Sequence, residues 1–138
     1  MSAPDDAVAR VAKEWIARAE DDWVTASHVL KLGKDCPTGS VCFHAQQCVE
    51  KYLKAVHVLN GREFPRTHDI EELFALLPVL QRPPLRIEDQ GLLSTYAVSV
   101  RYPTDEKPAS LSTAREAVKL ARRVRTWARK LLPKVKSV

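Results

Sequence analysis

The sequence has few of the features that build β-sheets, disulfide frameworks or membrane spans. Only four glycines occur among 138 residues, and few segments alternate in hydrophobicity as a strand would. No apolar run is long enough to cross a bilayer and no signal-peptide core is present, so we expect a cytoplasmic protein that does not enter the membrane. Cys36, Cys42 and Cys48 do not form an even disulfide framework and lack the paired C-x-x-C spacing of a zinc site. We therefore expect buried thiols at Cys42 and Cys48, with no metal and no other cofactor.

The chain has the length and composition of one soluble domain, residues 1–138. Its charge is uneven. Residues 1–114 hold 13 Lys/Arg against 16 Asp/Glu, a net of −3, whereas residues 115–138 hold nine against one, a net of +8. The two sum to the overall +5. The basic character therefore belongs to the C-terminal segment, including a tail over 133–138 that we expect to fray. Weak RNA attraction and an ordinary solvated helix face both fit it.

Apolar residues recur every three or four positions in several segments, which predicts helices. We expect helices over about 6–32, 40–60, 70–77 and 87–100, and a last helix that begins after Ser110 or Ser112. The predicted core positions are Val11, Trp15, Ala19, Trp23, Ala26 and Leu30 in the first helix, Leu92, Leu93, Tyr96, Ala97 and Val100 in the fourth, and Leu111, Ala114, Val118, Ala121, Val124, Ala128 and Leu131 in the last. About five helices with short loops predict an all-α, antiparallel, up-and-down bundle.

Several residues have the form of helix caps. Ser40 is a candidate N-cap for the second helix, and Gly61 is a candidate residue just beyond its C-terminus. Asp69, followed three residues later by Glu72, has the form of a capping box at the start of the third helix. Pro78 is expected to end or bend that helix.

A polar strip lies along the second helix, opposite its apolar face. His44, Gln47, Lys51 and Lys54 follow at spacings of three, four and three residues. Helical neighbours at these spacings are about 5–6 Å apart at Cβ, so the four side chains can act on one ligand together. The segment is therefore predicted to be a core helix with a binding strip along its side.

Three segments stand in order along this helical chain: F-H-A-Q-Q-x-x-E-K-Y-L-K-A at 43–55, R-T-H-D-I-x-x-L at 66–73, and R-Y-P at 101–103. Together with Trp15, Ala19, Asp22 and Trp23 they resemble the HEPN domain family (higher eukaryotes and prokaryotes nucleotide-binding), over roughly residues 8–130. The resemblance implies a bundle of about five helices and a substrate-binding module that accompanies minimal nucleotidyltransferases, often as a homodimer and often in toxin–antitoxin pairs. Many relatives are metal-independent RNases.

The sequence departs from the RNase members of that family. Those members carry an Arg, a polar residue and, after a short spacer, a His. Here Arg101 is followed by Tyr-Pro-Thr-Asp-Glu-Lys, with no histidine before the last helix. The Arg–His–Tyr pattern of the branch whose tyrosine is modified by its partner is also absent. The resemblance thus implies the binding role of the subgroup with F-H-x-x-Q and R-Y-P, carried by His44, Gln47, Lys51, Arg101 and Tyr102.

Each remaining candidate has a structural alternative. Lys54 is better explained as a surface charge paired with Glu50 at i,i+4 spacing than as a ligand contact. His68 is expected mainly to fix the start of the third helix with its neighbours, and only secondarily to reach the pocket. Arg101 either offsets the dipole at the end of the fourth helix or, with Tyr102, forms a platform for phosphate and base.

Two functions from different classes follow. The first is a nucleotide- or RNA-binding module, a homodimer that works with a separately encoded minimal nucleotidyltransferase, since this chain has no nucleotidyltransferase signature of its own. The alternative is a metal-independent ribonuclease toxin, in which His44 or His68 would move the proton and Arg101 would stabilise the developing charge. A subunit that only restrains its partner is a third possibility. Which nucleotide is bound, and whether the chain is toxin or antitoxin, stays open.

Overall fold

A computed structural model describes residues 6–99 and 108–132 of the chain. These residues contain no strand and form five α-helices: α1 (Asp6–Leu30), α2 (Thr38–Leu59), α3 (Ile70–Ala75), α4 (Ile87–Ser99) and α5 (Leu111–Leu131), with two short 3₁₀ helices, η1 (Gly33–Asp35) and η2 (Val79–Gln81). The predicted all-α fold is confirmed. Arg101, Tyr102, Val100 and the tail over 133–138 lie outside the described residues, and so do the side chains of 97–99.

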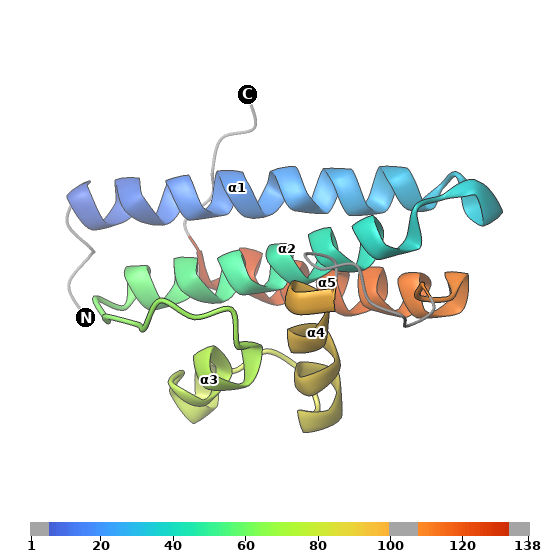
Figure 1. Cartoon of the computed structure of the whole chain (residues 1–138). Helices are drawn as coiled ribbons and strands as arrows, with labels where there is room; N and C mark the ends of the chain where they lie inside the picture. The colour runs from blue at the N-terminus through green and yellow to red at the C-terminus, as the bar shows by residue number, and fades with distance from the viewer. Residues whose placement is uncertain (1–5, 100–107, 133–138) are drawn as a thin grey trace.

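Helix α2 occupies the centre of the bundle. It packs against α1, α3, α4 and α5. In Figure 1, α1 lies along one side of α2, whereas the short α3 and α4 lie on the side away from α1. As a consequence α2 is buried from Ala45 to Glu50 and again from Tyr52 to His57. Its polar side chains are therefore covered by neighbouring elements to a degree that helical periodicity alone did not predict.

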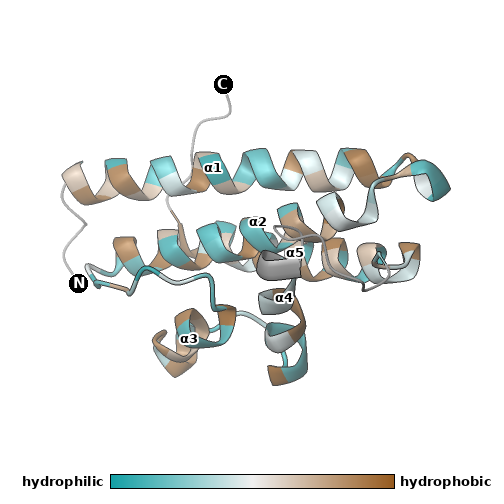
Figure 2. Ribbon diagram, viewed as in Figure 1, coloured by the Kyte–Doolittle hydropathy of each residue, from teal (hydrophilic) through white to brown (hydrophobic). Residues whose placement is uncertain are grey.

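The buried stripe of α1 includes Ala19 and Ala26 as predicted, but elsewhere it lies one residue away from the predicted positions. Ala12, Ile16, Ala19 and Ala26 are buried, whereas Val11 is 37% exposed. Trp15 and Trp23 are only partly buried and pack against the core from its edges. The expectation that both tryptophans sit inside the core is wrong because alanines form the close contact line, and a ring as large as indole fits only beside it. Figure 2 shows the alternation of hydrophilic and hydrophobic positions along α1.

Local capping chemistry accounts for most helix boundaries. Gly61 has φ +68°, as expected for the residue beyond α2. Asp69 Oδ1 accepts from the N–H groups of Glu71 and Glu72 at the start of α3, and Ser110 Oγ accepts from Thr113 at the start of α5. The capping box itself does not form as predicted, because the Asp69 N–H donates to Thr67 Oγ1, which takes the place of a glutamate.

The predicted start of α2 is wrong by about two residues. The helix begins at Thr38 with Pro37 as its N-cap, and the Val41 N–H donates to the Pro37 carbonyl at 3.1 Å. Ser40 is an exposed residue of the first turn instead of a cap. Reading Gly39 as a helix breaker caused the error, since a glycine in the first turn interrupts no bond of the i→i−4 ladder.

Two other core predictions are wrong. Leu92 is 40% exposed because α4 turns the side that carries Leu93 and Tyr96 toward the core. Leu131 is 38% exposed, and the next residue, Leu132, is buried in its place as the helix ends. The other described core predictions for α4 and α5 hold, with Leu111 partly buried. No helix within the described ranges is both long and apolar enough to cross a bilayer.

Candidate functional site

A buried carboxylate of α1 joins two of the predicted site residues. Asp22 occupies the buried stripe between Ala19 and Ala26. His44 Nδ1 donates to Asp22 Oδ1 at 2.8 Å, and Lys51 Nζ donates to Asp22 Oδ2 at 2.5 Å. A carboxylate can only accept, so the imidazole proton is assigned to Nδ1. We call Asp22, His44 and Lys51 the Asp22 cluster.

In the Asp22 cluster the carboxylate is buried, whereas the two basic side chains are partly exposed. The side chain of Asp22 is 9% exposed, whereas those of His44 and Lys51 are 32% and 22% exposed. The described residues provide no hydrogen bond to His44 Nε2. An anion arriving from solvent can therefore contact an imidazole edge and an ammonium group that are already held in place.

Lys54, the last residue of the predicted strip, is bound to a second buried carboxylate, Glu50, which is 2% exposed. Its Oε1 accepts from Gln46 Nε2 at 3.1 Å and from His68 Nδ1 at 2.8 Å, and its Oε2 accepts from Lys54 Nζ at 3.1 Å. We call Glu50, Gln46, Lys54 and His68 the Glu50 cluster. Of the four strip residues, His44 and Lys51 are thus bound to Asp22 and Lys54 is bound to Glu50.

The Glu50 cluster has the properties of a structural element. Lys54 is 7% exposed, and its Nζ lies 5.4 Å from the Trp15 ring centroid and 5.9 Å from that of Phe64. The predicted Lys54–Glu50 pair is present, but it is buried, so the expectation of a surface pair is wrong. His68 was expected to act with its neighbours Thr67 and Asp69, yet the bond described for its ring reaches across to Glu50 and ties the segment before α3 to α2.

Gln47 lies between the two clusters and is 8% exposed. Its Nε2 donates to Gln46 Oε1 at 2.6 Å, and Gln46 Nε2 in turn donates to Glu50 and to the His68 carbonyl. The amide of Gln47 is thus engaged within the helix bundle. A contact with a ligand would use the polar groups of the amide that remain, Oε1 and the second hydrogen of Nε2.

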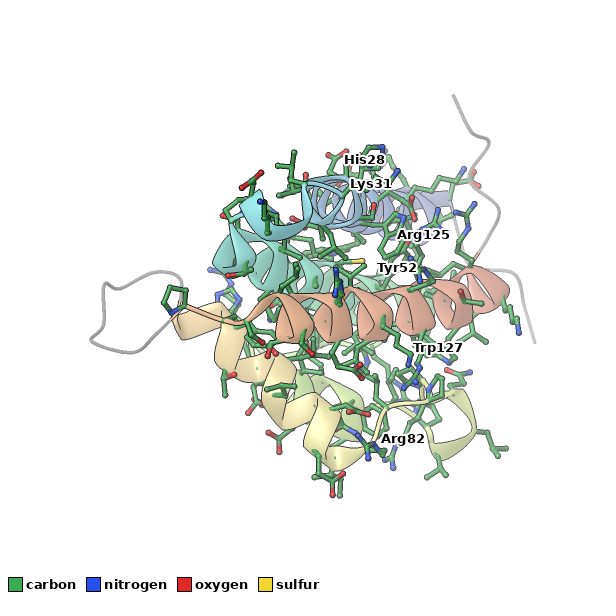
Figure 3. All side chains as sticks on the ribbon, turned by 90° about the vertical axis from the view of Figure 1, so that its right-hand side faces the viewer. His28, Lys31, Tyr52, Arg82, Arg125 and Trp127 are labelled. Carbon is green, nitrogen blue, oxygen red and sulfur yellow. The ribbon has the colours of Figure 1, made fainter. Side chains whose placement is uncertain are left out.

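A third acidic residue, Glu20, connects three helices. Arg125 of α5 donates through Nε and Nη2 to Glu20 Oε1 and Oε2 at 2.8 and 3.1 Å, and Tyr52 of α2 donates its hydroxyl to Glu20 Oε1. Figure 3 shows Tyr52 and Arg125 between α1 and α5. Burial raises the pKa of Glu20, but the hydrogen bonds from Arg125 and Tyr52 outweigh it, and the pKa is lowered. Burial and the contact with Glu20 raise the pKa of Tyr52.

Sequence reasoning assigned no role to Asp22, Glu20 or Arg125. Asp22 did carry a recognisable signal, because an aspartate three residues after Ala19 and four before Ala26 falls on an apolar stripe and needs a partner. Glu20 and Arg125 carried none, since they are 105 positions apart. The other predicted site residues, Arg101 and Tyr102, lie outside the described residues, so their relation to the Asp22 cluster stays a prediction.

The described residues offer no ready metal or thiol chemistry. Within 6–99 and 108–132, no group of three or more His, Cys, Asp or Glu side chains is arranged to hold a metal ion. Cys36, Cys42 and Cys48 are free and buried, which confirms the expectation for the latter two. Burial raises the pKa of Cys42 to about 11, and burial raises that of Cys48 well above its ordinary value. Their thiols are therefore protonated and unreactive at neutral pH.

Comparison with known proteins gives a relative that is similar in sequence and two solved structures that are similar in fold. The chain is 42% identical over 65 residues to a Methanocaldococcus jannaschii protein named "Putative toxin MJ1304"; the match covers 47% of this chain and 40% of that protein, so the chain spans less than half of this curated relative. The crystal structure of TT1696 from Thermus thermophilus is 29% identical, with a TM-score of 0.75, and the alignment covers 88% of this chain and 98% of that one. That of ST0689, described as an archaeal HEPN homologue, is 26% identical with a TM-score of 0.67, covering 86% and 95%.

The family described as the HEPN domain matches residues 12–131, which include all of α2 to α5 and most of α1. This match extends over most of the chain and agrees with the structural neighbours, so the protein belongs to the HEPN domain family.

Proposed function

We propose that this HEPN protein binds the phosphate of a nucleotide or an RNA through the Asp22 cluster. The observation that carries the proposal is that one buried carboxylate holds both His44 and Lys51 while each keeps part of its side chain exposed. Lys51 supplies a point charge for phosphate oxygens, and His44 presents Nε2 beside it. Gln47, Arg101 and Tyr102 complete the proposed site as further polar contacts and a stacking ring.

Asp22 determines what this site can bind. Its single negative charge offsets Lys51, so the cluster is close to neutral when the imidazole is neutral and positive when the imidazole is protonated. A phosphate monoester or diester supplies the counter-charge for the second state and can accept from both groups. Because Asp22 fixes both side chains beforehand, little rotamer entropy is lost when the anion binds.

We further propose that the protein is one member of a toxin–antitoxin-type pair, and that it acts as a homodimer beside a separately encoded minimal nucleotidyltransferase. Two observations support this assignment. The chain belongs to the HEPN family, and a relative over part of its length carries the name "Putative toxin MJ1304". The chain also carries no nucleotidyltransferase signature, so any transfer chemistry would come from the partner.

Calorimetric titration with ATP and with a short RNA tests the binding proposal. Charged hydrogen bonds contribute about 1.5–3 kcal/mol, so Lys51→Ala should weaken binding by roughly tenfold or more. Lys34→Ala is the matched control, since Lys34 is exposed and has no described ion pair, and it should bind as the parent does. If the parent protein binds neither ligand, alone or with its partner, the proposal is refuted.

The partner proposal has its own test. The protein is co-expressed with the product of any neighbouring nucleotidyltransferase gene, and the two are purified through a tag on one of them. Co-elution in a fixed ratio, with a particle mass that contains two copies of this chain, supports the pair and the homodimer. Separate elution of both proteins at micromolar concentration contradicts it.

One observation favours the ribonuclease alternative. The Asp22 carboxylate orients the His44 ring through Nδ1 and leaves Nε2 without a hydrogen-bond partner among the described residues, which is the arrangement of a general base. In that reaction Nε2 would take the proton of a 2′-hydroxyl as its oxygen attacks phosphorus, and Arg101 would stabilise the phosphorane charge. The bond from phosphorus to the 5′-oxygen would then break, and the imidazolium would return its proton to that oxygen. Incubation with total RNA in the presence of a chelator decides between the two functions. Cleavage that disappears in His44→Ala supports the nuclease, and binding without cleavage supports the binding module.

A further inference from the structure

The exposed face of α5 carries an almost unbroken row of cations. The residues are Arg115, Lys119, Arg122, Arg123, Arg129 and Lys130, all of them exposed, and we call this set the α5 basic strip. Glu116 is the only acidic residue of the helix. Among the described ion pairs, the strip takes part in one, a 3.9 Å approach of Arg129 to Glu20.

Folding of the helix does not explain the strip. Cations stabilise a helix through the macrodipole only in its last turn, which accounts for Arg129 and Lys130 but not for those near the middle. Arg115 and Lys119 are an i,i+4 pair of like charge, and so are Lys119 and Arg123. Such pairs destabilise an isolated helix. A bound polyanion would offset this repulsion, and the same cations would then stabilise the complex.

Helix α1 supplies an aromatic ring to the strip. The guanidinium carbon of Arg122 lies 5.5 Å from the Trp23 ring centroid, and that of Arg125 lies 5.3 Å from it. Arg125 is taken by Glu20, whereas no carboxylate within the described ranges pairs with Arg122. Arg122 is therefore held against a ring with its N–H donors available, which suits bidentate contact with a phosphate.

The strip and the Asp22 cluster are on different sides of α1. Trp23 contacts the guanidinium groups of α5, whereas the hydrogen bonds described for the Asp22 side chain come from α2. In Figure 3, which shows α5 along its length, Arg125 and Trp127 lie on opposite sides of that helix. The side of α5 that carries Arg125 contacts α1. The cations of the strip lie beyond this contact and are exposed to solvent.

We propose that the α5 basic strip, together with Trp23, binds the phosphodiester backbone of a nucleic-acid strand. The strip runs from Arg115 to Lys130, about 22 Å of helix at about 1.5 Å per residue, which is enough for several consecutive phosphates. This site goes beyond the proposed function of the Asp22 cluster and does not depend on it. A strand held along α5 can be long, whereas the Asp22 cluster takes one phosphate.

Fluorescence anisotropy of a labelled single-stranded RNA over a range of salt concentrations tests the proposal. Lys119→Gln combined with Arg122→Gln removes two contacts, so the slope of log K against log salt should become shallower by about 1.4, at about 0.7 per contact on a single strand. Arg10→Gln combined with Lys34→Gln is the control: both residues are exposed, neither has a described ion pair, and the net charge changes equally. The control should keep the parent slope.

Further measurements distinguish binding at the α5 basic strip from binding at the Asp22 cluster. A DNA strand of the same length should show the same loss in the strip variant, since the contacts are to backbone phosphates. Lys51→Ala, which tests the Asp22 cluster, should weaken ATP binding, and the strip substitutions should lower the RNA salt slope by the same amount in the presence and in the absence of Lys51→Ala, so either site can fail without the other. The proposal is overturned if the strip variant binds RNA like the parent, if the parent does not bind RNA, or if an acidic polypeptide such as polyglutamate binds the strip more tightly than RNA.

Discussion

Replacing Glu50 by alanine removes the acceptor shared by three side chains of the Glu50 cluster. Lys54 loses the only ion pair described for it, and Gln46 and His68 each lose a hydrogen bond to Oε1. Because Lys54 is only 7% exposed, water cannot solvate its ammonium group fully once the carboxylate is gone. The substitution therefore leaves an uncompensated charge inside the bundle.

The expected loss is large compared with the stability of a domain. Removing one partner of a buried ion pair costs about 3–5 kcal/mol, against a total of about 5–15 kcal/mol for a typical fold. The rings of Trp15 and Phe64 retain part of the attraction for Lys54, which favours the lower end of that range. With a urea m-value of about 2 kcal/mol/M, the unfolding midpoint should fall by about 1.5–2.5 M.

Urea unfolding of four proteins tests this reasoning: Glu50→Ala, Lys54→Met, the double variant, and Glu14→Ala as an exposed control on α1. The double variant should be more stable than Glu50→Ala by about 1–3 kcal/mol, because it buries no unpaired charge and keeps the apolar stem. The control should change by less than about 0.5 kcal/mol. A Glu50→Ala midpoint within about 0.5 M of the parent, or strict additivity in the double variant, refutes the account.

Three further outcomes follow from the described contacts. Because the pKa of Glu20 is lowered, its ionised carboxylate contributes to the free energy of unfolding above the ordinary pKa of 4.5, and this contribution is lost as pH falls through the lowered pKa. The free energy of unfolding of Arg125→Gln should therefore depend less on pH in that acidic range than that of the parent. Burial lowers the pKa of His57 from 6.5, and its Nε2–H donates to the Leu73 carbonyl at 2.8 Å. The contribution of neutral His57 to the free energy of unfolding is therefore present above pH 6.5 and lost as pH falls through the lowered pKa. His57→Gln, which keeps a hydrogen-bond donor, should make the stability depend less on pH in this range, which urea unfolding at several pH values measures. The three cysteines should react with a thiol reagent only after denaturant is added, which absorbance at the reagent's product band measures.

Rules that act over a few residues predicted the fold well. The spacing of apolar residues located α1 and α4, and cap chemistry located Gly61, Asp69 and Ser110. The errors arose where a neighbouring group replaced the expected partner, as Thr67 replaced a glutamate at the Asp69 N–H. Periodicity gives the direction in which a side chain points, but it does not say which element will cover it.

The sequence predicted the basic side chains of the candidate site but not the carboxylates that bind them. Spacing correctly placed His44 and Lys51 on one side of α2, where both reach Asp22. It could not show that Lys54, at the same flank, would be enclosed by the rings of Trp15 and Phe64, because those residues come from α1 and from the segment before α3. Which cations are available to a ligand depends on these tertiary contacts.

Acidic side chains determine which cations stabilise the fold and which remain available for binding. Glu50 binds Lys54 in the interior of the bundle, and Glu20 binds Arg125 through two N–H donors at the contact between α1 and α5. Lys51 follows a different pattern: its side chain is 22% exposed against 9% for Lys54, although the two are three residues apart on one helix. Asp22 therefore orients Lys51 without enclosing it. A cation that a fold orients but leaves open to solvent is the one that a phosphate can reach at little reorganisation cost, and for that reason Lys51, with His44, is the position where substitution should weaken phosphate binding.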